Sequence, residues 1–237
     1  VRDELNRQGK KAEAEAAFND KSFHLDHGRG LDCYSVGPSL GCGTPAIMQG
    51  DSILMPWCYE RYDVLDNGPL RLTFSLVYPK VNINGSDVVE HRIISIDKGS
   101  HFNKMTVWYE GLKNTVDVAG GFVVHDDKPE NLILSRDFIA YSDPTDNAEK
   151  NNFEIYVGVL FPDGADRTAF IPDSSHRKQG IVGNAVGVRR SVENKEKVVY
   201  WFGASWCKSG TPDKEVWLRQ ISRFLDDCRN PLIMEIG

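Results

Sequence analysis

The chain has 237 residues, 41% of them hydrophobic, and a formal net charge of −6, which indicates a folded globular protein. Its 28 lysines and arginines are scattered, so no basic stripe can neutralise nucleic-acid phosphates, and we expect no nucleic-acid partner. No apolar run approaches the roughly 20 residues that cross a bilayer, which predicts no membrane span.

Residues 2–17 are charged and Ala-rich, which is typical of an exposed helix or a frayed start. We therefore take residues 1–19 as an N-terminal extension and 20–237 as a single domain. In the domain, short β-branched and aromatic runs alternate with turn residues, the pattern of antiparallel all-β folds. Strands are expected at 53–59, 69–78, 88–97, 101–110, 116–125, 132–141, 153–161, 181–190 and 197–205.

The 69–78 run has the clearest strand pattern. Its apolar residues alternate with polar ones, so one face of the strand should be buried in the core. The residues expected on that face are Leu70, Leu72, Phe74, Leu76 and Tyr78.

A helix is predicted at the end of the chain. Thr211 can cap it and Pro212 suits its first position. Its apolar stripe should pack on a sheet and consists of Trp217, Ile221, Phe224 and Leu225. The sequence thus predicts an antiparallel β-sandwich with one C-terminal α-helix.

The segment from His24 to Tyr34 is the densest in chemically useful side chains. Two histidines, two aspartates, an arginine and a tyrosine surround two glycines, which let a backbone approach a ligand closely. The alternative is a polar loop whose side chains cap their own backbone. The glycine-rich residues 37–45 lack the lysine of a phosphate loop and are expected to form a structural loop.

Three further histidines lie on expected strands. His125 ends an apolar run and is the favoured catalytic candidate of the three, because strand ends open onto clefts. His101 would share a face with Met105 in a regular strand. His91 alternates with Arg92. A structural role is the alternative for each.

Metal binding has little support from the spacing of acidic residues. Segments 143–147 and 125–127 offer oxygen ligands suited to calcium, but neither has the spacing of a calcium loop. Asx turns explain both segments equally well. We expect no metal site and no cofactor, with a structural calcium as the one exception left open. The five cysteines contain no C-x-x-C pair, which disfavours structural zinc and a disulfide-dense framework.

Two tryptophans lie beside loop residues and are candidates for stacking on sugar rings. Trp57 adjoins Pro56 and Cys58, and Trp206 is close to Lys208. Other aromatic residues are expected mainly in the core.

Residues His24 to Gly43 resemble a bacterial family of uncharacterised domains from polysaccharide-degradation loci. Further resemblance is found at residues 62–71, 95–104, 140–146 and 200–206. That family is similar to the galactose mutarotase-like supersandwiches, and one relative resembles an oligosaccharide dehydratase. The resemblance implies a periplasmic or secreted protein. It also implies a β segment before the His24 motif. In this chain that segment is expected to be missing or reduced to residues 1–19. The missing segment is therefore a candidate partner, and the chain is expected to be cut from something longer.

From the resemblance and the residue types we expect a carbohydrate-active enzyme of polysaccharide breakdown that acts on an oligosaccharide by acid/base chemistry. It would be of the lyase/dehydratase or the mutarotase type. Histidine and tyrosine suit proton transfer near neutral pH, and the catalytic candidates are His27, His125, His24 and Tyr34. Arg29 would hold a substrate carboxylate or sulfate. The other substrate-binding candidates are Trp206, Trp57, Lys208 and His101. The alternatives are a non-catalytic carbohydrate-binding module and a structural fragment.

Overall fold

The computed structural model describes residues 2–19, 22–28, 30–55, 58–145 and 148–232. The chain divides into two compact units, each described by itself. Unit 1 comprises Val1–Ser35 and Pro144–Glu154, and unit 2 comprises Val36–Asp143 and Ile155–Gly237. This division does not follow the boundary expected at residue 19, and the single-domain expectation stays a prediction.

Unit 1 is built from short helices and a loop. The helices are α1 (Arg2–Arg7), α2 (Lys11–Asn19) and the π-helical turn η2 (Ala148–Asn152). Two asparagines of η2 hold the loop that follows α2. Asn152 Nδ2 donates to the carbonyl of His24 at 2.6 Å, and Asn151 Oδ1 accepts from the N–H of Asp26 at 2.6 Å. The helical character expected for residues 2–17 is confirmed.

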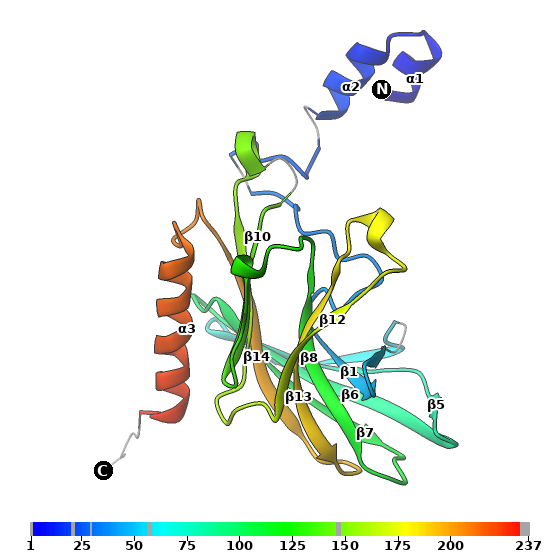
Figure 1. Cartoon of the computed structure of the whole chain (residues 1–237), viewed down its shortest axis with the longest axis vertical. Helices are drawn as coiled ribbons and strands as arrows, with labels where there is room; N and C mark the ends of the chain where they lie inside the picture. Colours follow the sequence, from blue (N-terminus) through cyan, green and yellow to red (C-terminus); the bar gives the residue numbers. More distant parts are fainter. Residues whose placement is uncertain (1, 20–21, 29, 56–57, 146–147, 233–237) are drawn as a thin grey trace. The chain divides into compact units, whose positions relative to one another are not determined.

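Unit 2 contains two antiparallel sheets that form a sandwich (Figure 1). In order across the five-stranded sheet, which we call sheet A, the strands are β12 (Arg167–Pro172), β13 (Gly183–Val192), β8 (Val116–Val124), β1 (Cys42–Gln49) and β2 (Ser52–Leu54). Every pairing in it is antiparallel.

The second sheet, sheet B, has nine strands. Eight follow in the order β3 (Arg61–Asn67), β4 (Arg71–Val77), β6 (Ser86–Asp97), β7 (Phe102–Glu110), β14 (Val198–Trp206), β11 (Ile155–Leu160), β10 (Phe138–Asp143) and β9 (Leu132–Leu134), while β5 (Val81–Ile83) pairs with β6. The 3-10 turns η1 (Pro129–Asn131) and η3 (Arg177–Gln179) lie in connecting loops. The predicted antiparallel sandwich is confirmed.

The core between the sheets depends on glycine as well as on aromatic residues. Tyr200 is fully buried, and a Cβ added at Gly120 would lie 2.7 Å from its ring. The Tyr200 hydroxyl donates to the carbonyl of Gly43 at 2.7 Å, which ties β14 to β1 across the sandwich. Phe122 and Tyr141 also meet there, with nearly parallel rings.

The C-terminal helix α3 (Lys214–Arg229) packs on the other face of sheet B, as its apolar stripe predicts. Its cap is Asp213, whose carboxylate accepts from the N–H of Val216 at 2.7 Å. The prediction of Thr211 as the cap is wrong, because Thr211 is buried and its hydroxyl donates to Gln220 at 3.0 Å.

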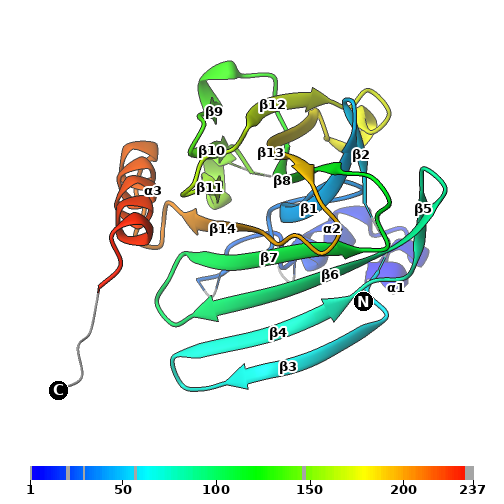
Figure 2. The ribbon, with the colours of Figure 1, turned by 90° about the horizontal axis from the view of Figure 1, so that it is seen from below.

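The predicted strand at 69–78 begins at Arg71, and Leu70 is 72% exposed, contrary to prediction. Leu72 and Phe74 are only half-buried. Figure 2 shows the reason, since β4 and β3 extend sheet B at the edge beyond β6. The alternating apolar residues of β4 are therefore less buried, because they lie close to that edge of the sheet.

Other strand predictions also need correction. Residues 42–45, expected in a loop, begin β1, where Gly43 takes a φ of +91° at a bulge against β8. The strands at Arg61–Asn67 and Arg167–Pro172 were not predicted. The run expected at 132–141 is two strands, β9 and β10, which pair as a hairpin.

Candidate functional site

A histidine and an aspartate from the two different sheets meet at one end of the sandwich. His125 directly follows β8 of sheet A, and Asp143 is the last residue of β10 in sheet B. Nδ1 of His125 is hydrogen-bonded to the carboxylate of Asp143. The side chains are 14% and 2% exposed, respectively. A buried carboxylate on one ring nitrogen fixes the ring's orientation and stabilises its protonated form.

Tyr141 lies directly beside this pair. Its hydroxyl accepts a hydrogen bond from the backbone N–H of His125 at 3.2 Å. Burial raises the pKa of Tyr141 far above its ordinary value, and the charges of Asp143 and Asp126 raise it further. Tyr141 therefore stays protonated and acts as a hydrogen-bond donor.

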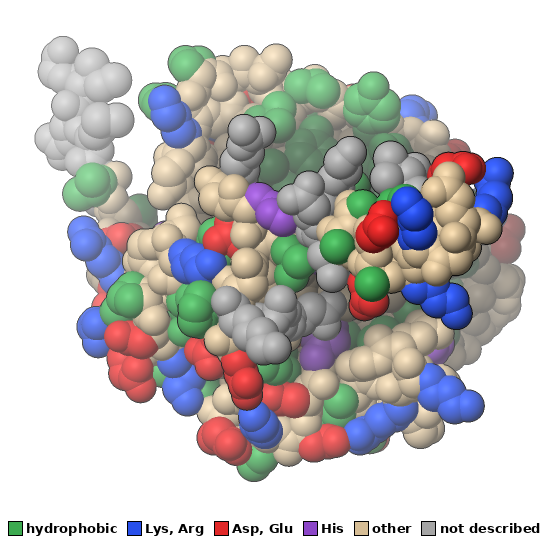
Figure 3. Space-filling model, turned by 90° about the horizontal axis from the view of Figure 1, so that it is seen from above, with side chains coloured by type: hydrophobic (Ala, Val, Ile, Leu, Met, Phe, Trp, Pro, Cys, Tyr) green, Lys and Arg blue, Asp and Glu red, His purple; other side chains and the backbone are tan. Residues whose placement is uncertain are grey.

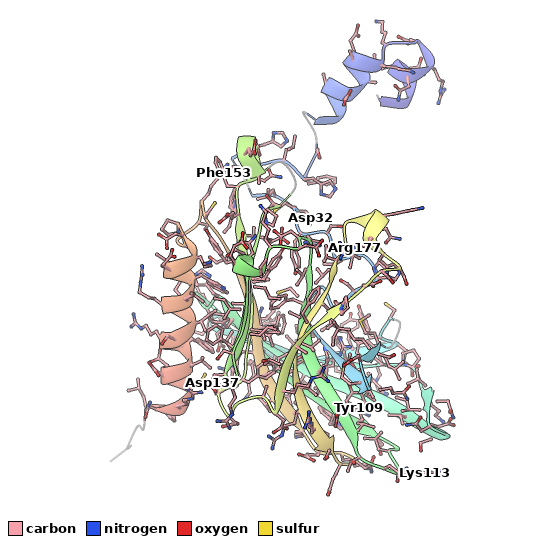
Figure 4. The ribbon with its side chains drawn as sticks, viewed as in Figure 1. Asp32, Tyr109, Lys113, Asp137, Phe153 and Arg177 are labelled. Atoms are coloured by element: carbon pink, nitrogen blue, oxygen red, sulfur yellow. The ribbon has the colours of Figure 1, made fainter. Side chains whose placement is uncertain are left out.

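The loop after His125 carries two more carboxylates with separate partners. Asp126 accepts from the side-chain amide of Asn131 at 2.8 Å. Asp127 forms a two-point ion pair with Arg177 of η3 at 2.6 and 3.0 Å, and this pairing lowers the pKa of Asp127. Arg177 is labelled in Figure 4 at the upper end of unit 2, whereas Lys113 and Asp137, which precede β8 and β10, lie at the lower end.

A second histidine–aspartate pair occupies the same end of sheet A. His176 Nδ1 lies 2.7 Å from a carboxylate oxygen of Asp173, and this hydrogen bond lowers the pKa of Asp173. The N–H of Asp173 donates to the carbonyl of Val182, whose own N–H donates to the carbonyl of Val124. Asp173 thus lies two strands across from the residue that precedes His125.

A cavity of about 250 Å³ adjoins the loop after His125. Its apolar walls come from strands of both sheets and the turn before β9, and its rim carries carboxylates. The lining residues are Val124, Asp126, Asp127, Lys128, Pro129, Leu132 and Phe170. In the space-filling view of Figure 3, histidine side chains reach the surface at separate places among interspersed acidic and basic side chains.

The strand register brings a predicted stacking residue close to Asp143. Asp143 pairs with Ile155 of β11, and Ile155 pairs with Trp206 of β14. Residues paired across neighbouring strands project from the same face of a sheet. Lys208 Nζ lies 5.2 Å from the centre of a Trp206 ring, as expected for a cation over an aromatic face.

His101 lies just outside β7 and contacts the helix. Its ring meets that of Trp217 of α3 edge-on, with 6.1 Å between the ring centres. Met105 instead is buried in the sheet, so the face-sharing expected for a regular strand over 101–110 does not extend to His101. Its role in substrate binding stays a prediction.

The histidine loop of unit 1 is bonded to its own backbone. His24 Nδ1 lies 2.5 Å from the carbonyl oxygen of Asp32, and His27 Nε2 lies 3.0 Å from that of Ser22. These are the bonds that the structural alternative for this loop predicts. The catalytic roles of His24, His27 and Tyr34 stay predictions, and Arg29 and Trp57 lie outside the described residues.

In the described part of the chain, no three His, Cys, Asp or Glu side chains are grouped so that they could hold a metal ion. The helices described there are too short or too polar to cross a membrane. The expectations about metals and cofactors stay predictions.

Sequence reasoning missed Asp143, Tyr141 and His176 as site residues. The signal for the first two was present, because Ile139, Tyr141 and Asp143 alternate along one strand face. The strand was expected to stop at residue 141, which left Asp143 outside it.

The model of a family described as "Domain of unknown function (DUF4861)" matches residues 3–233. Among curated proteins, the chain is similar to "Uncharacterized protein P7" of Formosa agariphila, with 28% identity over 225 residues. The match covers 93% of this chain and 54% of that protein, so the chain spans about half the length of this curated relative. No solved structure gives a significant match.

Proposed function

The chain belongs to the DUF4861 family of domains of unknown function, and we propose, from the site together with the resemblance found in the sequence, that it is an enzyme that acts on oligosaccharides by acid/base chemistry. The observation that carries this proposal is the His125–Asp143 pair. It joins a titratable ring to a buried carboxylate at the end of both sheets, with Tyr141 beside it. A histidine held in this way is a suitable proton acceptor at neutral pH.

The reaction class we favour is elimination of the lyase or dehydratase type. A base removes a proton from a sugar carbon, and the electron pair of that C–H bond forms a C=C bond. The neighbouring C–O bond breaks as an acid protonates the departing oxygen. His125 is the proposed base, and Asp143 stabilises the imidazolium that forms. A mutarotase-type reaction also needs one base and one acid, which would take the proton of the anomeric hydroxyl and protonate the ring oxygen as the ring opens; it is the alternative within the enzyme class.

The proton donor in this scheme is a second histidine. His27 keeps the role expected from the sequence, and His176 is a further candidate because Asp173 orients its ring at the same end of sheet A. The catalytic roles expected for Tyr34 and His24, which belong to unit 1, stay separate proposals. Trp206 and Lys208 would bind the sugar, and no cofactor is required for these transfers.

The test is a mass-spectrometric screen of uronate-containing and sulfated oligosaccharides for loss of water or for chain cleavage. His125→Ala should lower turnover roughly a hundredfold to ten-thousandfold. His91→Ala is the matched control, because the His91 ring stacks on Trp108 on a different part of sheet B. Full activity in His125→Ala would remove that residue from the mechanism.

His27→Ala is the parallel test for unit 1 and should also abolish turnover while the fold is retained. Equal activity of His27→Ala and the wild type, with His176→Ala inactive, would assign the donor role to His176.

A non-catalytic carbohydrate-binding module is the second candidate, and the placement of Trp206 under Lys208 favours it. Such a module would bind sugars in the same screen and never alter them. The further proposals rest on the family resemblance: a galactose mutarotase-like supersandwich, a periplasmic or secreted location, and association with a β segment. The greater length of the curated relative is compatible with such a segment.

A further inference from the structure

The backbone of His125 is held by a side chain of the opposite sheet. Its N–H donates to the hydroxyl of Tyr141 at 3.2 Å, while its ring is bonded through Nδ1 to the carboxylate of Asp143. Strand β8 of sheet A ends at Val124. Contacts with β10 of sheet B therefore take over the positioning of the residue that follows.

The two residues of β10 that make these contacts belong together. Tyr141 and Asp143 are two residues apart on one strand, so both side chains project from the same face of sheet B. Both residues are buried. They reach His125 at two different points, the main chain and the ring, and two fixed points restrict a side chain more narrowly than one.

The Tyr141 hydroxyl also holds the loop that follows His125. Burial is the largest cause that raises the pKa of Tyr141, and a hydrogen bond to the carboxylate of Asp126 is a further one. Asp126 in turn accepts from the side-chain amide of Asn131 at 2.8 Å and from the N–H of Lys128 at 3.3 Å. The phenol thus uses its donor on the loop and an acceptor site on the backbone N–H of His125.

The Tyr141 ring is itself fixed by its surroundings. It lies nearly parallel to the fully buried ring of Phe122 of β8, with 6.2 Å between the ring centres. Its backbone pairs with Leu132 of β9 on one side and with Val157 of β11 on the other. Because the ring has so little freedom, its hydroxyl can serve as a fixed point for both partners.

We infer that Tyr141 is a positioning residue for His125, and that its phenol joins the loop of Asp126 to the ring that Asp143 orients. The inference rests on the proposed function, since His125 is the base of the proposed reaction. Tyr141 acts through His125 and need not touch the substrate. Small displacements of a catalytic group are costly in rate, so a base must be held in place by its neighbours.

The test follows the two ring nitrogens of His125 by long-range ¹H–¹⁵N NMR of the full chain, labelled with ¹⁵N-histidine. The spectrum is recorded above the pH at which the ring loses its second proton. In the wild type, Nδ1 should carry the remaining proton, because it is bonded to a carboxylate. Tyr141→Phe leaves the His125 N–H without its acceptor. The two nitrogen signals should then move toward each other, as the loosened ring samples both tautomers.

The chain offers an internal reference and a matched control. His176 Nδ1, bonded to Asp173 at 2.7 Å, appears in the same spectrum and should not change. Tyr156→Phe removes the hydroxyl of an equally buried residue that packs beneath α3, and it should leave the His125 signals in place. Asp126→Ala removes the acceptor of the Tyr141 phenol at a half-buried position. It should move the His125 signals in the same direction as Tyr141→Phe.

Unmoved His125 nitrogens in Tyr141→Phe would overturn the inference. Where that variant does not fold, unmoved nitrogens in Asp126→Ala would overturn it. An equal movement in Tyr156→Phe, or of the His176 reference, would do the same, since the effect would then be a general loss of packing. Averaged His125 signals already in the wild type would show that the ring is not held.

Kinetics separate this inference from the proposed function. Where the wild type turns over an oligosaccharide, Tyr141→Phe should lower kcat roughly tenfold to a hundredfold and leave KM within about twofold. Absence of turnover in the wild type would contradict the proposed function, while the NMR result would still decide whether Tyr141 positions His125. An unchanged kcat with displaced His125 signals would contradict the catalytic part of the inference.

Discussion

Asp143 and Trp206 project from the same face of sheet B, with only Ile155 of β11 between them. Two strand spacings put their backbones roughly 10 Å apart. A sugar ring stacked on Trp206 would therefore extend toward the His125–Asp143 pair. In the proposed function, the same face of the sheet would supply both the stacking residue and the pair that transfers a proton.

Trp206→Ala should raise the KM for an oligosaccharide about tenfold with a smaller change in kcat, because stacking contributes to binding before the reaction begins. Trp201→Ala is the control on the same strand, since Trp201 faces α3 and contacts Phe224. The measurement is steady-state kinetics, which give KM and kcat for both variants at equal folded concentration. An effect of Trp201→Ala as large as that of Trp206→Ala would count against a stacking role.

Asp143→Asn should lower kcat about a hundredfold or more, because an amide cannot stabilise the imidazolium of His125 as a carboxylate does. The mass-spectrometric assay measures the loss. Asp173→Asn makes the same change in the second histidine–aspartate pair and shows which pair takes part. Unchanged turnover in Asp143→Asn would mean that the pair is structural.

Gly43→Ala should destabilise the protein more than Gly50→Ala. Both glycines have positive φ, so alanine costs about 1 to 2 kcal/mol of backbone strain at either position. At Gly43 the added Cβ would also overlap the ring of Phe202, whereas Gly50 has open space around it. Overpacking adds about 1 to 3 kcal/mol at Gly43. Denaturant unfolding measures the free energy of unfolding of both variants. Equal losses of stability in Gly43→Ala and Gly50→Ala would show that β1 can shift away from β14.

Leu225→Ala should lower the free energy of unfolding by about 2 to 5 kcal/mol, because Leu225 is 4% exposed between α3 and sheet B. Leu70→Ala is the same change at a residue that is 72% exposed and should stay within about 0.5 kcal/mol. Urea titrations of the two variants provide the comparison. A large loss of unfolding free energy in Leu70→Ala would instead support the buried position that the sequence predicts for Leu70.

Asp127→Asn should destabilise the protein at pH 6 but not at pH 2. Arg177 lowers the pKa of Asp127 in the folded state, so the pair stabilises the fold above the unfolded pKa of about 3.9. That contribution is lost as the pH falls through the lower folded pKa. Because both side chains are largely exposed, the difference in Tm should be only about 1 to 2 °C. Calorimetry from pH 6 to pH 2 measures the Tm of the wild type and of Asp127→Asn. A difference in Tm that stayed constant over this range would contradict the prediction.

Much of the fold follows from local patterns in the sequence. The apolar spacing of Trp217, Ile221 and Leu225 predicts the C-terminal helix and the face that it buries, because helical periodicity is a property of consecutive residues. Alternation likewise predicts strands such as β7 and β14. The capping residue was predicted wrongly as Thr211, because Thr211 and Asp213 are both residue types that suit an N-cap and only the packing around Thr211 separates them.

Only the tertiary structure decided which strands share a sheet and how far each is buried. Leu70 and Phe122 both lie in or beside apolar runs, yet one is 72% exposed and the other 0%, because sheet B continues past β6 to an open edge while β8 is central in sheet A. The meeting of His125 with Asp143 has the same origin. It depends on β8 and β10 ending at the same end of two different sheets, and that long-range arrangement is set by packing between sheets, which the pattern of a single strand does not encode.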